Sequence, residues 1–324
     1  MGFVKTISRV LAFAILLYPT FASAEKIRVA YVALAASQSP VWVALEQGFF
    51  KREGLEVELM YIRSGPFGLA AILSGDVAFG SVGGAAVLNA IEQKADIRVI
   101  AIPIKKPAFS LVTSSNIRNP SDLVGKKVGI TRFGGLYDFG LRYALRQWKI
   151  PTNQVQILQI GGISEIVAAV HSGQIDAAVL ADPASFKAIE YGFRELLNFA
   201  TLDVTFPMNA VIARERLLQE NPSLVNRFTA AFVNGISFMK AERAKTTAVI
   251  KKYTRIDEKD LLDKTYDLVV GQHLLVDPSP DVRVLQSAFQ MMGKSDSDIR
   301  LMNLPRYIAP EFVEGVKKSG AAKK

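Results

Sequence analysis

The sequence from residue 55 to residue 80 reads LEVELMYIRSGPFGLAAILSGDVAFG, and a similar stretch follows 98 residues later. Residues 55–62 alternate apolar and polar side chains, which predicts a strand, and Gly65-Pro66 begins a helical segment that ends at Ser74-Gly75. Adding 98 carries Val57, Leu59 and Ile62 onto Val155, Ile157 and Ile160, and residues 70–75 onto residues 168–173. A strand, a helix and a turn that recur at one offset predict two similar lobes.

The segments on either side continue the alternation of short apolar runs with helical patterns. In the first half, strands are predicted at 27–32, 55–62, 77–80 and 98–104, with helices that begin at Ser39-Pro40, at Gly65-Pro66 and after Gly83-Gly84. In the second half, strands are predicted at 127–131, 155–160 and 177–180, with helices at 137–148 and 163–170. This order predicts an α/β fold with largely parallel sheets.

Two short apolar segments, 109–113 and 208–213, flank the second half, and we expect both to cross between the lobes as a two-strand hinge. Further helices are expected to begin at Asn221-Pro222 and Asp277-Pro278. The expected division is 1–24 for a signal peptide, 25–114 for the first part of lobe I, 115–207 for lobe II, 208–315 for the rest of lobe I and 316–324 for a basic tail.

The first 24 residues have the pattern of an export signal. Lys5 and Arg9 charge its start, residues 10–17 form an apolar core, and Ala22-Ser23-Ala24 has the form of a cleavage site. The apolar core is about half the roughly 20 residues that a membrane-spanning helix needs. We therefore expect cleavage after Ala24 and a periplasmic protein.

The composition excludes several classes of function. The 324 residues include no Cys, which excludes cysteine-based metal sites, redox sites and nucleophiles. The sequence has only two His, His171 and His273, which excludes a histidine-rich metal site. The formal net charge is +9, but the basic residues are scattered along the chain, so no nucleic-acid partner is expected. A net positive charge favours a small anionic ligand. We expect no metal, no cofactor and no catalytic residue.

The candidate site is the set of turns that lead from predicted strands into predicted helices. In parallel α/β lobes these turns meet at one edge of the sheet, where helix N-termini offer unpaired N–H groups to an anion. Here they are small or polar, at residues 36–39, 63–65, 81–84, 131–135, 161–164 and 181–183. The candidate ligand-binding residues are Ser37, Gln38, Ser39, Trp42, Arg63, Ser64, Gly65, Val82, Gly83, Gly84, Thr131, Arg132, Phe133, Gly134, Gly162, Ala181, Asp182 and Asn209.

Several candidates have a second interpretation that the sequence leaves open. Ser39 and Asp182 are also typical helix N-caps, whose side chains bond to their own backbone. Arg63 and Arg132 could pair with a ligand anion, or instead be solvated or form an ion pair between the lobes. Aromatic residues of the first helical turns could serve as core packing or as an apolar wall of the site; they are Trp42, Phe67, Phe133 and Tyr137.

Four segments resemble solute-binding proteins of ABC transporters of the nitrate, sulfonate and taurine type. They are residues 43–57, 74–80, 122–129 and 172–178, and the resemblance as a whole runs from Ile27 to Leu218. It implies a type II periplasmic-binding-protein fold, in which two lobes close on a ligand and present it to a membrane permease and its ATPase. We also expect the protein to be a monomer. The family's ligand-facing positions correspond to Ser37, Gln38, Ser64, Gly65, Gly83, Thr131, Gly134 and Asp182, whereas Ala181 stands where many relatives have an aromatic residue.

Three functions remain open at this point. The first is capture of a small anionic organic solute that is sulfonate-, carboxylate- or nitrate-like, without catalysis. The second is an enzyme on the same fold, of the decarboxylase or pyrimidine-precursor-synthase type, which would need a base, nucleophile or metal in the cleft. The third is a ligand sensor that signals to a membrane receptor. The sequence leaves the identity and size of the ligand open.

Overall fold

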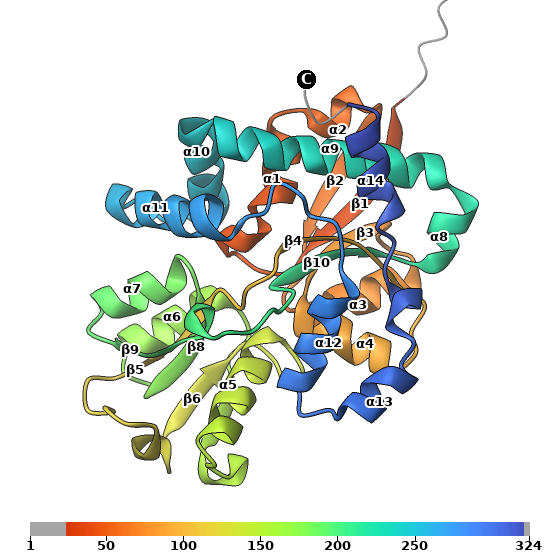
Figure 1. Cartoon of the computed structure of the whole chain (residues 1–324). Coiled ribbons are helices and arrows are strands. Elements are labelled where there is room, and N and C mark those ends of the chain that lie inside the picture. Colours follow the sequence, from red (N-terminus) through yellow and green to blue (C-terminus); the bar gives the residue numbers. More distant parts are fainter. Residues whose placement is uncertain (1–23, 321–324) are drawn as a thin grey trace, which may run out of the picture.

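Two five-stranded mixed sheets organise the chain, whose computed structural model describes residues 24–320 (Figure 1). The expected signal segment up to residue 23 and the last four residues lie outside the described residues. The first sheet contains β1 (Glu25–Tyr31), β2 (Leu55–Tyr61), β3 (Phe79–Gly83), β4 (Arg98–Ile104) and β10 (Asn209–Ala213). The second contains β5 (Phe109–Thr113), β6 (Lys127–Ile130), β7 (Gln156–Gln159), β8 (Ala177–Ala181) and β9 (Arg194–Asn198).

The two sheets have equivalent strand orders: position by position, β2, β1, β3, β10 and β4 of the first correspond to β7, β6, β8, β5 and β9 of the second. This equivalence confirms the predicted duplication. The orders are β2-β1-β3-β10-β4 and β7-β6-β8-β5-β9, and in each the fourth position holds a strand that runs antiparallel to both neighbours. The offset of 98 carries β3 (Phe79–Gly83) onto β8 (Ala177–Ala181). Each lobe therefore repeats one α/β unit and takes one strand from a crossing segment.

The crossing strands correct the expected boundary of lobe I. Residues 109–113 are expected in lobe I, whereas β5 pairs with β8 and β9 of the second sheet. The chain therefore enters lobe II in the link between β4 and β5. The physical reason is that β5 fills the gap between β8 and β9, a long-range pairing that local apolar pattern does not encode. The return strand, β10, lies in lobe I as expected.

Helices cover both sheets, and the helices predicted within the two repeats begin within one residue of their predicted starts. In lobe I they are α1 (Ser39–Glu46), α2 (Phe49–Arg52), α3 (Gly65–Ser74) and α4 (Gly84–Glu92), and in lobe II they are α5 (Leu136–Gln147), α6 (Ile163–His171) and α7 (Ala184–Glu190). After β10 the chain forms α8 (Glu215–Glu220), α9 (Pro222–Ala241), α10 (Arg243–Thr254), α11 (Lys259–Thr265), α12 (Val282–Met291), α13 (Asp296–Leu301) and α14 (Glu311–Lys318). A π-helix, Tyr266–His273, continues α11.

The C-terminal part gives one confirmed cap and two corrections. The Asn221 side chain accepts a hydrogen bond from the Leu224 N–H at the start of α9, as predicted. No helix begins at Asp277-Pro278, because Asp281 is the residue that caps α12. The expected basic tail starts too early at 316, since α14 continues to Lys318 and Val316 is buried.

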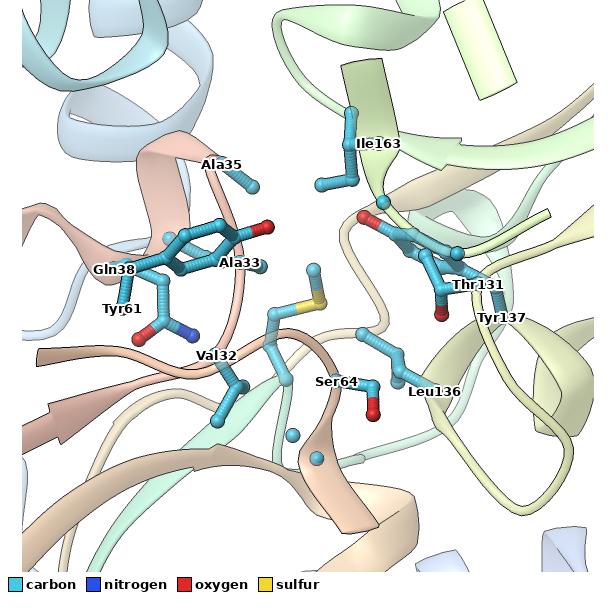
Figure 2. A pocket seen from close by; sticks show the side chains of 16 residues that line it. Val32, Ala33, Ala35, Gln38, Tyr61, Ser64, Thr131, Leu136, Tyr137 and Ile163 are labelled. Carbon is cyan, nitrogen blue, oxygen red and sulfur yellow. The ribbon is translucent and has the colours of Figure 1, made fainter. Parts of the chain in front are cut away.

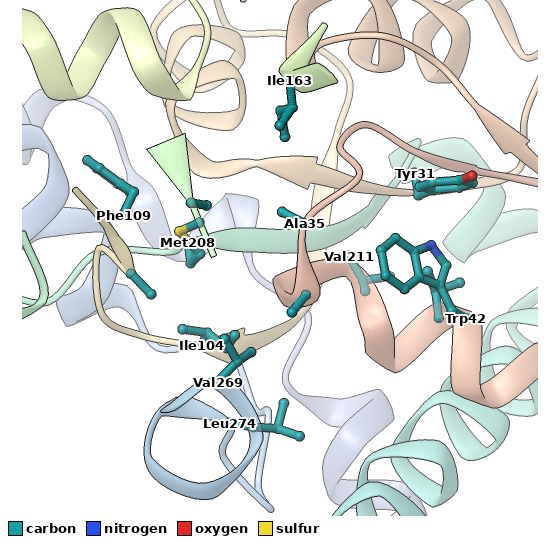
Figure 3. Close-up of a cluster of buried hydrophobic side chains, with 14 of the residues drawn as sticks. Tyr31, Ala35, Trp42, Ile104, Phe109, Ile163, Met208, Val211, Val269 and Leu274 are labelled. Carbon is teal, nitrogen blue, oxygen red and sulfur yellow. The ribbon is translucent and has the colours of Figure 1, made fainter. Parts of the chain in front are cut away.

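The hydrophobic core is continuous from lobe I through the crossing segments (Figure 3). Near the hinge, the Phe109 ring lies 4.6 Å from the ring of Phe199, centroid to centroid, and Ile104 and Met208 are buried beside the crossing. Gly84 is needed where α4 passes the return segment, because a Cβ there would lie 1.9 Å from the Pro207 carbonyl oxygen. Within residues 24–320, no helix combines the length and apolarity needed to cross a membrane.

Candidate functional site

A cavity lies between the two lobes at the carboxyl ends of the strands. Its volume is about 40 Å³. Its lining combines residues of both lobes: Val32, Ala33, Ala35, Ser37, Gln38, Tyr61, Ser64, Gly65, Gly83, Thr131, Leu136, Tyr137, Gly161, Gly162, Ile163 and Met208. The lobes therefore enclose the cavity closely.

Five helices begin at this cavity, and none carries a side-chain N-cap. They are α1, α3, α4, α5 and α6, with Gln38, Ser64, Gly83, Gly135 and Gly162 at their N-cap positions. The first N–H groups of a helix have no partner within it, and the helix dipole is positive at this end. The cavity thus receives uncapped N-termini from both lobes, an arrangement that favours an anion.

Two buried polar side chains of the lining lack a hydrogen-bond partner among residues 24–320. The Ser64 Oγ and the Gln38 Oε1 are both unpaired, although Ser64 is only 8% exposed and Gln38 only 2%. Ser64 also has a φ of 78°, a backbone conformation that non-glycine residues rarely adopt. Unpaired buried polar atoms are costly unless something else bonds to them, which makes both atoms candidates for contact with a ligand.

Two tyrosines bring their hydroxyl groups into the cavity from opposite lobes (Figure 2). Tyr61 ends β2 in lobe I and stacks on Tyr31, with ring centroids 5.3 Å apart. Tyr137 lies in the first turn of α5 in lobe II and is buried. Burial raises the pKa of both tyrosines, so their hydroxyls stay protonated and can donate hydrogen bonds.

Seven of the residues expected at the site line the cavity. They are Ser37, Gln38, Ser64, Gly65, Gly83, Thr131 and Gly162. The other eleven lie outside the lining: Ser39, Trp42, Arg63, Val82, Gly84, Arg132, Phe133, Gly134, Ala181, Asp182 and Asn209. Most of these eleven have contacts elsewhere that account for them.

The two arginines join the lobes to each other. The Arg63 Nη1 lies 2.7 Å from the Glu165 Oε1 of α6, which is the interlobe ion pair left open by the sequence. The Arg132 guanidinium lies 3.8 Å from the ring centroid of Phe67 in α3. Both contacts cross from one lobe to the other, so they stabilise the closed arrangement.

Backbone contacts add to this closure. The Ala36 N–H donates to the Asp182 carbonyl across the cleft, at 3.1 Å from nitrogen to oxygen. The Asn89 Nδ2 donates to the Gly134 carbonyl at 3.2 Å. Gly134 and Asp182 therefore act between the lobes rather than in the lining.

The Asp182 carboxyl group faces its own lobe. It accepts a hydrogen bond from the Ser185 hydroxyl, and burial raises its pKa to about 6, with a further contribution from Glu195. Ser39 likewise bonds locally, since its hydroxyl donates to the Ala36 carbonyl at 2.5 Å. Neither residue is an N-cap, because Gln38 and Pro183 hold the N-cap positions of α1 and α7, but both side chains bond locally and neither lines the cavity.

The remaining candidates lie in the core or at the surface. Trp42 is fully buried and stacks on Tyr253, with ring centroids 4.6 Å apart. The Asn209 Nδ2 donates to the Ser81 Oγ at 2.8 Å. Val82 is buried in the core of lobe I, Ala181 pairs with Phe109 in the second sheet, and Phe133 is exposed.

The candidate ligand-binding residues predicted from the sequence include neither the apolar lining nor Tyr61 and Tyr137, although Tyr137 is among the aromatic residues that could form an apolar wall. The place of Tyr61 at the site could have been predicted, because it is the last residue of a strand directly before the turn 63–65. The local sequence does not predict Met208 at the site. It precedes a strand that is antiparallel to its neighbours, so the beginning of β10, and not its end, lies at the cavity.

We expect the Arg63–Glu165 pair to contribute to closure without touching the ligand. Both side chains are partly exposed, and exposed ion pairs are worth about 0.2–1 kcal/mol. Arg63→Gln and Glu165→Gln should each weaken binding of every ligand about two- to five-fold, and the double variant should be no weaker than either. Isothermal titration calorimetry at low and high salt measures this. A much larger loss confined to Arg63→Gln would instead place Arg63 on the ligand.

Comparison with known proteins agrees with this geometry. The family model described as NMT1/THI5 like matches residues 36–245. A protein of Brucella abortus (strain 2308) named as a binding protein is 29% identical over 259 residues, 78% of this chain and 79% of its own. The taurine-binding periplasmic protein of Escherichia coli (strain K12) is 29% identical over 213 residues, 63% of this chain and 64% of its own.

A solved structure supports the fold. The periplasmic nitrate-binding protein of Synechocystis PCC 6803 matches with a TM-score of 0.74, over 91% of this chain and 89% of its own, at 14% identity. The expected periplasmic-binding-protein fold is confirmed by this likeness and by the two five-stranded sheets. Identity at this level carries no information about the ligand.

Proposed function

Because the chain belongs to the NMT1/THI5-like family, whose match spans both lobes and the cavity between them, we propose that it captures a small organic anion for import. The protein is a solute-binding protein of the ABC-importer type. The observation that supports an anionic ligand is the convergence on one cavity of five helix N-termini that have no side-chain cap, together with the unpaired Ser64 hydroxyl. Its periplasmic location and its partners, a membrane permease and an ATPase, follow from the same assignment.

We propose that the protein binds without chemical conversion. The polar side chains of the lining are hydroxyls and one amide, Gln38, with no general base or nucleophile activated by a neighbour. No group of His, Asp or Glu within residues 24–320 has the arrangement of a metal site. Ligand contacts to both lobes would then shift an equilibrium between open and closed forms.

Thermal unfolding of the exported chain, from Glu25 onward, tests the proposal against sulfonates, carboxylates, nitrate, bicarbonate and pyrimidines. A ligand at about 1,000 times its Kd stabilises by roughly 4 kcal/mol, and about 2–4 °C per kcal/mol makes the shift in Tm easy to detect. We expect one class of organic anion to raise Tm by more than about 5 °C and to be recovered unchanged. No shift with any anion, with no ligand seen by native mass spectrometry, would contradict anion capture, and turnover would contradict binding without conversion.

Ser64→Ala should separate a ligand contact from a structural role. The Ser64 hydroxyl has no partner within residues 24–320, so its removal should leave Tm within about 2 °C. A hydrogen bond to a charged group is worth about 1.5–3 kcal/mol, so affinity should fall about 10- to 100-fold. Ser74→Ala, at the far end of α3, is the control and should bind as the unaltered protein does. Equal affinity in both variants would remove Ser64 from the site.

A further inference from the structure

The cavity has an electrostatic bias of one sign. No residue of its lining carries an ionisable acidic or basic group other than the two tyrosine hydroxyls, which stay neutral. The remaining bias comes from the five helix N-termini, each equivalent to about half a positive charge near its end. These N-termini stabilise a negative group at the helix starts and disfavour a positive one there. The unpaired Gln38 Oε1 is neutral and only accepts hydrogen bonds, so it suits an uncharged donor of the ligand.

Three carboxylates that lie close to the lining in the sequence or face the cleft are already bonded elsewhere. Asp138, directly after Tyr137, accepts a hydrogen bond from the Gly134 N–H and pairs with Arg142. Glu165, two residues after Ile163, pairs with Arg63 across the cleft. Asp182 is buried and accepts from the Ser185 hydroxyl. None of the three lines the cavity, so a ligand ammonium group would find no carboxylate in the lining to compensate for its lost hydration.

Six side chains of the lining are apolar and come from both lobes and the hinge (Figure 2). These side chains are Val32, Ala33, Ala35, Leu136, Ile163 and Met208. They suit the uncharged hydrocarbon part of a ligand, whereas the hydroxyls of Ser64, Tyr61 and Tyr137 can donate to anionic oxygens.

We infer that the site selects an organic anion whose remaining part is uncharged, and rejects the matching zwitterion that carries an ammonium group. This inference rests on the proposed function and specifies its ligand class. It predicts that this chain does not share the ligand for which its Escherichia coli relative is named, since taurine is the ammonium-bearing counterpart of ethanesulfonate.

Matched pairs of ligands test the inference on the full exported chain. Isothermal titration calorimetry compares ethanesulfonate with taurine, butyrate with 4-aminobutyrate, and benzenesulfonate with 4-(aminomethyl)benzenesulfonate. In each pair of which at least one member binds, we expect the ammonium-free ligand to bind at least ten-fold more tightly than the zwitterion. If the zwitterion binds equally well or better, the inference is wrong while anion capture stands. If no member of any pair binds while another anion raises Tm in the thermal-unfolding panel, the inferred ligand class is wrong and anion capture stands. If no anion binds in either experiment, both are wrong.

A charge introduced at Thr131 gives a second, independent test. Thr131 lines the cavity directly after β6, and its side chain points into it in Figure 2. Thr131→Asp should reverse the preference within the pair that binds, toward the zwitterion. Thr131→Asn introduces a side chain of nearly the same shape as aspartate but without charge. In this variant the ammonium-free ligand should still bind more tightly than the zwitterion. If both variants favour the ammonium-free ligand equally, the selectivity does not arise from charge in the cavity.

Discussion

Gly83→Val should lower ligand affinity by at least thirty-fold while the protein remains folded. Gly83 lines the cavity at the start of α4, and a Cβ there would lie 3.5 Å from the Leu136 Cβ of the other lobe. That distance is ordinary contact for a Cβ alone, so the two γ-methyl groups of valine extend into space that Leu136 and the ligand use. The added side chain would both fill the small cavity and hold the lobes apart.

The measurements for this variant are titration calorimetry for affinity and small-angle scattering for lobe separation. Gly315→Val is the matched control, because a Cβ at Gly315 in α14 would meet no atom within 4 Å. The control should bind within two-fold of the unaltered protein. Unchanged affinity in Gly83→Val would show that the ligand does not occupy the cavity between β3 and α5.

Asp182→Asn should remove a pH dependence of stability. Burial raises the pKa of Asp182 to about 6, above its ordinary value of 3.8, so between these values the folded protein binds a proton that the unfolded chain releases. The contribution of this group to stability therefore falls as pH rises from about 4 to about 6. A shift of about two units corresponds to about 2–3 kcal/mol.

Urea unfolding at pH 4 and pH 7.5 measures this difference. The stability of Asp182→Asn relative to the unaltered protein should rise by about 2–3 kcal/mol between the two values. Ser185→Ala removes the hydrogen bond that lowers the pKa of Asp182, so its decline in stability should extend to higher pH. If the two proteins keep a constant difference across this range, the carboxyl group titrates as an ordinary exposed one.

Ligand affinity in Asp182→Asn distinguishes the two interpretations of this residue. The side chain lies outside the lining, and the contact across the cleft is made by the backbone carbonyl of Asp182, which the substitution retains. Affinity at pH 7.5 should therefore stay within about three-fold. A loss of more than ten-fold would return Asp182 to the group of direct ligand contacts.

Local sequence determined the architecture of this protein to a large extent. The 98-residue repeat, the apolar runs and the prolines in the first turns at Ser39-Pro40 and Gly65-Pro66 specify strands and helices through near-neighbour interactions. Because the carboxyl ends of parallel strands meet at one edge, those same patterns located Gln38, Ser64, Gly83 and Thr131 at the cavity.

Only the tertiary structure decided how these turns are used. Whether Arg63 meets a ligand or Glu165, and whether Tyr61 faces Tyr137, depends on how the hinge orients one lobe against the other. The strand that joins each sheet from the crossing is likewise chosen by long-range pairing, which places β5 in lobe II and Met208 at the cavity. Periodicity along the chain records which face of an element is apolar, but it holds no information about distances between residues of separate lobes.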